Sequence, residues 1–174
     1  MHIISVTGHR PNSLGGYPIP SGVYNYLSNK IKKAFEINKA DRVIVGMALG
    51  VDQIAAKCCI DLGIPFVAAV PFKGQENKWS KAYKKEYQSL LDKAKQVVYT
   101  SSGGFAAWKM FFRNEWMVNN SDKVLAVWNK VEKGGTYHAV SYARGVGKPI
   151  IFVDISSNNK EFIRILNQGE HGTL

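Results

Sequence analysis

Short, continuous apolar runs alternate along the chain with longer segments in which apolar residues recur every three or four positions. The runs cover residues 3–6, 42–45, 66–70, 97–100, 124–128 and 150–153. Each run is rich in β-branched or aromatic residues and lacks the strict alternation of a half-exposed strand. We therefore expect six buried β-strands.

The segments between the runs have helical spacing, with one apolar face and one polar face. The expected helices include residues 24–35, 54–62, 79–94, 112–117, 135–145 and 160–166. Gly63 and Pro65 mark the end of the second helix. Strand–helix alternation over the whole chain predicts an α/β fold with a mainly parallel sheet and helices on both faces. No linker or repeat divides the sequence, so we expect one domain spanning residues 1–174.

Composition narrows the class of protein. The 174 residues are 45% hydrophobic and 21% charged, which is typical of a soluble globular chain and excludes a disordered one. No apolar stretch reaches the roughly 18 residues of a membrane helix, and the first residues lack the pattern of a secretory signal. We expect a cytoplasmic protein without membrane contact.

The net charge is +10, which favours a phosphorylated or polyanionic partner, although a solvated basic surface would give the same total. The two cysteines, Cys58 and Cys59, are adjacent in sequence. Neighbouring cysteines rarely reach disulfide geometry and are too few for a structural zinc site. We expect reduced, apolar thiols, with no metal site and no identified cofactor.

Ligands of parallel α/β sheets bind at the carboxyl ends of the strands, so the residues after each run are the candidates for function. Gly8, His9 and Arg10 follow the first run. The glycine permits close approach of the backbone to a ligand, and the arginine suits a phosphate. His9 is better explained as a hydrogen-bonding neighbour than as a catalytic acid or base.

After the second run, Gly46 and Gly50 bracket a turn that opens into a helix, a geometry that attracts anions. Asp52 either caps that helix or accepts a hydrogen bond from a ribose hydroxyl. The spacing matches neither the dinucleotide fingerprint nor a P-loop. After the third run, Gln75 is a candidate for bonding a base or sugar, whereas core packing explains Trp79 better than base stacking does.

After the fifth run, Gly134, Gly135 and Thr136 enter a further helix. Backbone N–H groups and one hydroxyl at a helix start suit a phosphate. The alternative is an ordinary helix start in which Thr136 is the N-cap.

Four segments together resemble the YpsA-like (DUF1273) family of the SLOG superfamily, which is named for the Smf/DprA and LOG proteins. They read TGHRP, GMALGVDQIAA, PFKGQENKW and RNEWMVNNSDKVLAVWNKVEKGGTYHAVSYA. The resemblance covers nearly the whole chain and implies a Rossmann-like three-layer sandwich of the SLOG type, with a nucleotide or nucleotide-derived ligand at the strand ends. Short members of the family occur among prophage genes, so we expect this chain to be encoded by a prophage.

The branches of the superfamily imply different functions. The DNA-processing branch binds single-stranded DNA, and its motif Ser-Gly-x-Ala-x-Gly-Ile-Asp resembles the stretch from Gly46 to Asp52. The LOG branch hydrolyses the N-glycosidic bond of nucleoside 5′-monophosphates. Its Arg and Met pair resembles Arg113 and Met117, but Ala139 occupies the place of its glutamate. A third branch senses nucleotide signals such as cyclic ADP-ribose derivatives.

The resemblance and the residues together predict binding of a phosphorylated nucleoside or nucleotide-derived small molecule, by a sensor or sequestering protein that is a possible homo-oligomer. The expected ligand-binding residues are Gly8, His9, Arg10, Gly46, Gly50, Asp52, Gln75, Arg113, Gly134, Gly135 and Thr136. One alternative is phosphoribohydrolase activity, with Arg113 and Asp52 as catalytic residues or with Glu76 or Glu115 replacing the absent glutamate. The other is single-stranded DNA binding.

Overall fold

The central element of the protein is a six-stranded sheet in which every pair of neighbours is parallel. The computed structural model describes the backbone of residues 1–171 and the side chains of residues 1–168. The strands lie in the order β4-β3-β2-β1-β5-β6. Their bounds are Ile3–Gly8 (β1), Arg42–Val45 (β2), Phe66–Val70 (β3), Gln96–Tyr99 (β4), Lys123–Trp128 (β5) and Ile150–Asp154 (β6).

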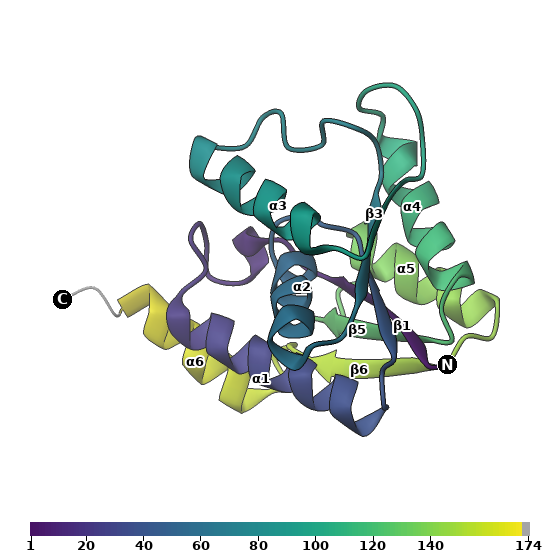
Figure 1. The fold of residues 1–174 in the computed structure, drawn as a ribbon. Coiled ribbons are helices and arrows are strands. Elements are labelled where there is room, and N and C mark those ends of the chain that lie inside the picture. The colour runs from purple at the N-terminus through teal and green to yellow at the C-terminus, as the bar shows by residue number, and fades with distance from the viewer. Residues whose placement is uncertain (172–174) are drawn as a thin grey trace.

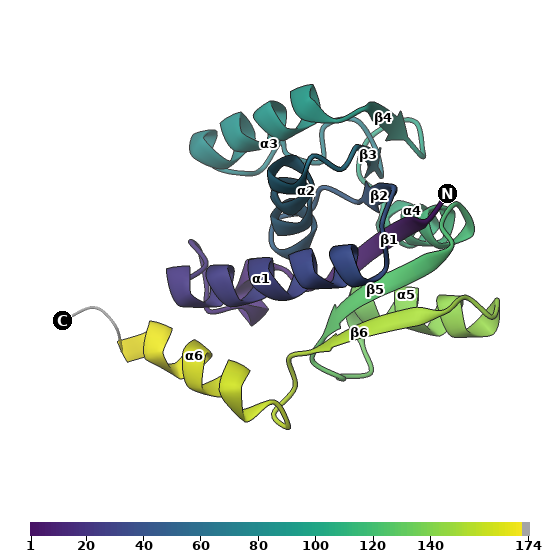
Figure 2. The ribbon, with the colours of Figure 1, turned by 60° about the horizontal axis from the view of Figure 1, so that its bottom comes forward.

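Helices cover both faces of this sheet, which confirms the expected three-layer sandwich (Figure 1 and Figure 2). Their bounds are Ser21–Ile37 (α1), Val51–Leu62 (α2), Lys81–Lys93 (α3), Ala107–Asn119 (α4), Gly134–Gly145 (α5) and Lys160–His171 (α6). Helices α1 and α2 pack together on one face with α3 and α6 beside them, and α4 packs against α5 on the other. Among the described residues, no helix is both long and apolar enough to cross a membrane.

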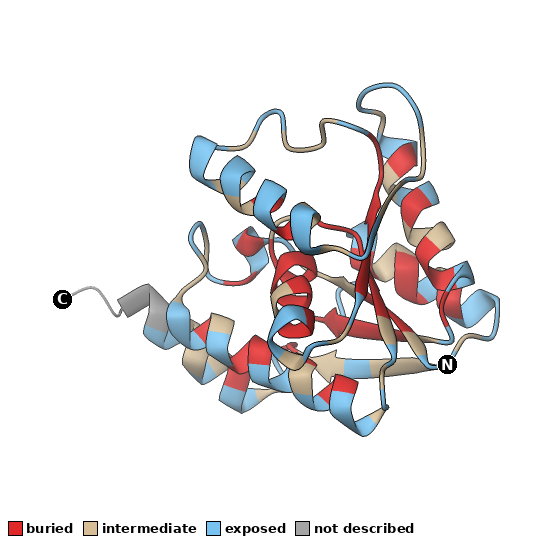
Figure 3. Ribbon diagram, in the orientation of Figure 1, coloured by how far each residue is buried: buried red, intermediate tan, exposed pale blue. Residues whose placement is uncertain are grey.

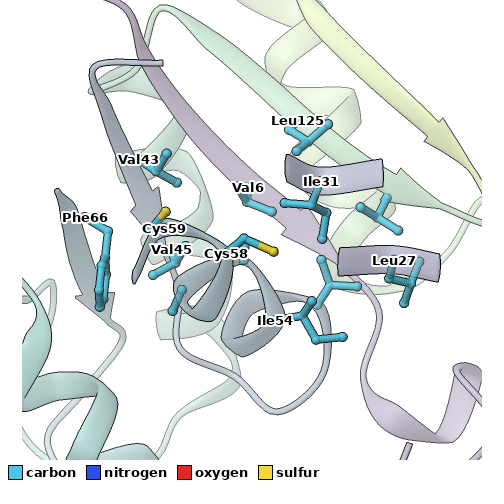
Figure 4. Packing of buried hydrophobic residues seen from close by; sticks show 14 of the residues in the cluster. Val6, Leu27, Ile31, Val43, Val45, Ile54, Cys58, Cys59, Phe66 and Leu125 are labelled. Atoms are coloured by element: carbon cyan, nitrogen blue, oxygen red, sulfur yellow. The ribbon is translucent and has the colours of Figure 1, made fainter. Parts of the chain in front are cut away.

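The main hydrophobic core lies between α1, α2 and the sheet (Figure 3 and Figure 4). Leu27 and Ile31 of α1 meet Ile54 and Cys58 of α2 there, above Val6 of β1. Helix α2 ends at Gly63, whose left-handed backbone (φ 68°) suits a residue without a side chain. A smaller cluster under α4 joins Met117 to strands β2 and β3.

Two expectations about the elements are wrong. The strands β4 and β6 are only partly buried, because each lies at an edge of the sheet and pairs with one neighbour. The third helix begins at Lys81 and not at Trp79, because the Ser80 side chain caps it by accepting a hydrogen bond from the Tyr83 amide (3.4 Å).

Candidate functional site

A cavity of about 450 Å³ opens at the carboxyl ends of β1 and β5, between α4 and the first turns of α2 and α5. The structure brings eight of the residues expected to bind ligand to its wall. They are Gly8, His9, Arg10, Asp52, Arg113, Gly134, Gly135 and Thr136. These residues come from four separate stretches of sequence, and the parallel sheet is what places them at one edge.

Arg113 is the buried charge of this cavity, with only 5% of its surface exposed. Its Nη1 donates hydrogen bonds to the carbonyl oxygens of Gly46 (2.6 Å) and Ala69 (3.2 Å), at the ends of β2 and β3. Its Nε donates to the side chain of Asn114 (3.0 Å). Within the described residues Nη2 has no hydrogen-bond partner. Burial lowers the pKa of the guanidinium. Arg113 therefore ties three elements together and keeps donor capacity at the cavity.

Asp52 is the one carboxylate among the described residues that line this cavity. Its Oδ2 accepts a hydrogen bond from the backbone N–H of Ala48 (3.1 Å). Burial raises the pKa of Asp52, and the positive charge of Arg113 opposes that shift. The N-cap of α2 is Gly50, so the carboxylate bonds the preceding loop and does not cap the helix. The capping interpretation of Asp52 is therefore wrong.

Gly46 and Gly50, which were expected to bind ligand, do not line the cavity but pack against residues that do. A Cβ atom on Gly46 would stand 2.5 Å from Nη1 of Arg113 and 2.9 Å from Oδ2 of Asp52. A Cβ atom on Gly50, whose φ is +102°, would clash with the carbonyl oxygen of His9. That carbonyl accepts a hydrogen bond from the Val51 amide (3.1 Å), which holds the loop after β1 against the start of α2. Both glycines thus allow a close approach of protein to protein.

His9 and Arg10 follow β1 and have different surroundings. Nε2 of His9 accepts a hydrogen bond from the Asn129 amide (3.1 Å), which joins the ends of β1 and β5. Burial lowers the pKa of His9, so the neutral ring is favoured at physiological pH. Arg10 is exposed and lines both this cavity and a neighbouring one. The structure therefore gives His9 a positioning contact and leaves the Arg10 guanidinium open to solvent.

The first turn of α5 forms the opposite wall. Its N-cap is Lys133, no side chain caps the turn, and Thr136 is a buried residue inside the helix. The interpretation of Thr136 as the N-cap is therefore wrong. The first N–H groups of a helix have no intrahelical partner, and here they stand beside Gly134 and Gly135 at the cavity wall. This end of the helix carries partial positive charge.

Other residues expected to contribute lie outside this cavity. Gln75 lines a neighbouring cavity of about 330 Å³. Glu115 lies beside His138 (3.4 Å), and neither Glu115 nor Glu76 is among the described residues that line the first cavity. The described residues contain no group of three or more His, Cys, Asp or Glu side chains placed to hold a metal ion.

Sequence reasoning missed the loop that precedes α4. Phe105 of this loop and Met110 of α4 line the cavity, and Lys109 is buried where its Nζ donates to the carbonyls of Ser102 and Gly104 (both 2.6 Å). The loop between residues 100 and 106 follows β4, the edge strand, so its position after a strand was a usable signal. The loop was missed because residues 101–104, which follow the apolar run, are polar residues and glycines without a charged side chain that would mark a binding site.

The model of the YpsA family, described as the YspA SLOG family, matches residues 4–150. The chain belongs to this family. An uncharacterized SPbeta prophage-derived protein, YoqJ of Bacillus subtilis (strain 168), is 33% identical over 119 residues, which are 59% of this chain and 69% of that protein. A UPF0398 protein of Bacillus thuringiensis (strain Al Hakam) is 25% identical over 158 residues and 85% of each chain. The resemblance inferred from the four segments is thus confirmed, including a prophage-derived relative.

Solved structures of other proteins share the fold. DNA processing protein A of Streptococcus pneumoniae superposes with a TM-score of 0.67 at 16% identity, over 99% of this chain and 55% of its own. The same protein from Helicobacter pylori, solved for its single-stranded DNA binding mode, gives 0.63 at 18% identity over 98% and 73%. The molybdenum cofactor binding protein of Rippkaea orientalis gives 0.58 at 17% identity over 97% and 86%. Such identities show the fold alone.

Proposed function

We propose that this SLOG protein binds a phosphorylated nucleoside or a nucleotide-derived small molecule in the cavity at the carboxyl ends of β1 and β5, as a sensor or sequestering protein. The observation that carries the proposal is the convergence of Arg113, Arg10 and the uncapped start of α5 on one cavity of about 450 Å³. A cavity of this size is typical of small-molecule sites.

The phosphate has a physical reason to enter this cavity. Arg113 is held in place by two backbone carbonyls, so its unpartnered Nη2 donates to a ligand without a loss of side-chain entropy on binding. The N–H groups of Gly135 and Thr136 add neutral donors with partial positive charge. Arg10 supplies a second guanidinium from the open side. A phosphate dianion satisfies all three donors at once.

Asp52 would then contact the sugar. Its carboxyl group lines the cavity, and one of its oxygens already accepts the Ala48 amide (3.1 Å), which leaves the other for a ribose hydroxyl. The same carboxyl group favours a second candidate function, hydrolysis of the N-glycosidic bond. Burial raises the pKa of Asp52, which favours the protonated form that a general acid needs. Ala139, which replaces the glutamate of the hydrolytic branch, is a buried core residue.

The relatives of known structure bind ligands of different size. The DNA processing protein A of Helicobacter pylori binds single-stranded DNA, whereas the protein of Rippkaea orientalis binds the molybdenum cofactor. The burial of Arg113 supports the small-molecule class, because a continuous strand that tracks along a surface groove would not reach this side chain.

Calorimetric titration with AMP, GMP, CMP and UMP tests the proposal, with each mixture then analysed for free base. We expect at least one nucleotide to bind unchanged, and Arg10→Met to weaken it about tenfold, the loss expected of one charge-assisted hydrogen bond. Arg164→Met is the matched control, since Arg164 is an exposed arginine on α6 away from the cavity. Equal effects of the two variants would contradict the proposal.

Other outcomes would favour another function. Release of free base that is lost on replacement of Asp52 would establish hydrolysis. Binding only of a single-stranded oligonucleotide, with steep salt dependence, would establish the DNA alternative.

A further inference from the structure

A second cavity of about 330 Å³ adjoins the first one. The two cavities share four lining residues, which are Arg10, Ala48, Phe105 and Met110. The two cavities are therefore neighbours, and Arg10 and Phe105 border both of them.

The wall of the second cavity differs in chemistry from that of the first. Its aromatic side chains are Tyr17, Phe72, Trp79, Tyr83 and Phe105. The rings contact one another edge to face, with centroids 6.1 Å apart for Tyr17 and Tyr83 and 6.0 Å apart for Phe72 and Phe105. Described side chains with a carboxylate do not line this cavity. Such a wall suits a flat π-system, whose faces stack on aromatic rings.

Trp79 and Gln75 are both held in place at this wall. Trp79 packs edge-on against Tyr87, with ring centroids 5.3 Å apart, and Gln75 donates from Nε2 to the Tyr87 hydroxyl (3.3 Å). Within the described residues Oε1 of Gln75 has no partner, so it can accept a hydrogen bond from an amino group or ring N–H at the edge of a base. Trp79 thus takes part in core packing and also presents surface to the cavity.

We infer that the second cavity binds the base of a ligand whose phosphate lies in the first cavity, with Arg10 between the two; this rests on the proposed function. The division follows from the chemistry of the walls. The buried Arg113 and the start of α5 line the first cavity only, whereas four of the five aromatic residues of the second cavity line the second only. Arg10 lines both, and Lys78 adds a cation at the second. In the reverse arrangement, the phosphate would lie in the second cavity and the base in the first. The buried guanidinium of Arg113 would then have no anion beside it.

The experiment compares nucleotides with ribose 5-phosphate, which has the same sugar phosphate but no base. The dissociation constants of AMP, GMP, CMP, UMP and ribose 5-phosphate are measured for the wild type and for Tyr83→Leu and Phe105→Leu. Tyr99→Leu is the matched control, because Tyr99 is an aromatic residue of β4 with 47% exposure that does not line this cavity. Leucine keeps an apolar side chain at each position and removes the aromatic ring, together with the hydroxyl group at positions 83 and 99.

For the wild type we expect a nucleotide to bind more tightly than ribose 5-phosphate. Tyr83→Leu should weaken that nucleotide between about fivefold and a hundredfold, the range expected for one lost stacking contact, and should leave ribose 5-phosphate unchanged. Unchanged binding of ribose 5-phosphate also shows that the variant folds. If the wild type binds nucleotides and ribose 5-phosphate with equal affinity, the base cavity is refuted and the phosphate site is not. The same conclusion follows if Tyr83→Leu and Phe105→Leu weaken nucleotide binding no more than Tyr99→Leu does. Failure of every probe to bind the wild type overturns both proposals.

Discussion

Replacement of Arg113 by methionine separates the structural role of this arginine from its role toward a ligand. Methionine fills much of the same space but makes none of the hydrogen bonds to Gly46 and Ala69. It also removes the positive charge that stabilises the ionised form of Asp52. We expect Arg113→Met to fold, to lose stability at neutral pH, and to lose more as the pH rises.

The magnitude follows from two opposing contributions. Each hydrogen bond from a charged donor contributes about 1.5–3 kcal/mol, so the two bonds to carbonyls contribute about 3–6 kcal/mol. The desolvation penalty of the guanidinium is recovered in the variant and offsets part of this. We therefore expect the free energy of unfolding to fall by about 2–4 kcal/mol near pH 7. Arg164→Met, at an exposed position, should change it by less than about 0.5 kcal/mol.

The pH dependence gives the sharper test. Because the pKa of Asp52 is raised in the folded protein, the stability that it contributes is complete below its unfolded value of 3.8 and declines as the pH rises through the raised value. Loss of Arg113 raises that pKa further, so the decline extends to higher pH. The loss in Arg113→Met should therefore be larger at about pH 8 than at about pH 5.5, with a slope of at most about 1.4 kcal/mol per pH unit.

Urea unfolding, followed by the fluorescence of the four tryptophans, measures these differences. Asp52→Asn in the Arg113→Met background should remove the extra pH dependence and recover part of the lost stability. A loss below about 0.5 kcal/mol at pH 8 would show that the fold does not depend on the buried arginine. Arg113→Met could also lower the free energy of unfolding equally at both pH values, whether position 52 is aspartate or asparagine. That result would refute the coupling of the Arg113 and Asp52 charges.

Three further variants or treatments test other parts of the structure. Gly46→Ala should destabilise the protein by about 1–3 kcal/mol in urea unfolding, because its methyl group would stand 2.5 Å from the buried guanidinium, whereas Gly104→Ala, with nothing within 4 Å, should change little. Lys109→Met removes two hydrogen bonds of 2.6 Å to the preceding loop, so chymotrypsin should cut that loop faster than in the wild type, and equal rates would refute the tether. Cys58 and Cys59 are buried and their thiol pKa values are raised, so a disulfide reagent should modify them only after unfolding; rapid modification of the folded protein would contradict their burial.

Most of the fold follows from the spacing of apolar residues, because a buried parallel sheet requires continuous apolar strands and amphipathic helices. The expected strand at residues 97–100 lies one residue from the observed Gln96–Tyr99. The first turn of α4 was missed for a physical reason. Trp108 of this turn and Phe111 and Phe112 of the next turn are exposed, so apolar residues do not mark the buried face of this helix.

The candidate site was predictable only where it depends on topology. Gly8 ends a strand, Arg10 and Gly134 follow strands, and a parallel sheet places the carboxyl ends of all its strands at one edge. The roles of Gly46 and Gly50 were not predictable, because glycines that admit a ligand and glycines that admit a neighbouring side chain look alike in sequence. The second cavity depends on the packing of the loops around Gln75 and Phe105, which no local pattern encodes.

Under the proposed function, the two arginines would contribute to anion recognition differently because they differ in burial. Arg113 donates to backbone carbonyls at the ends of two strands, so its position is fixed before a ligand arrives and the sheet determines where its free nitrogen points. Arg10 is exposed and borders both cavities, so it can follow a ligand that spans them. A fixed donor gives selectivity for the position of the anion, and a mobile donor adds affinity for ligands of more than one length. This division explains why the deeper arginine should be sensitive to changes in the fold and the outer one mainly to the ligand.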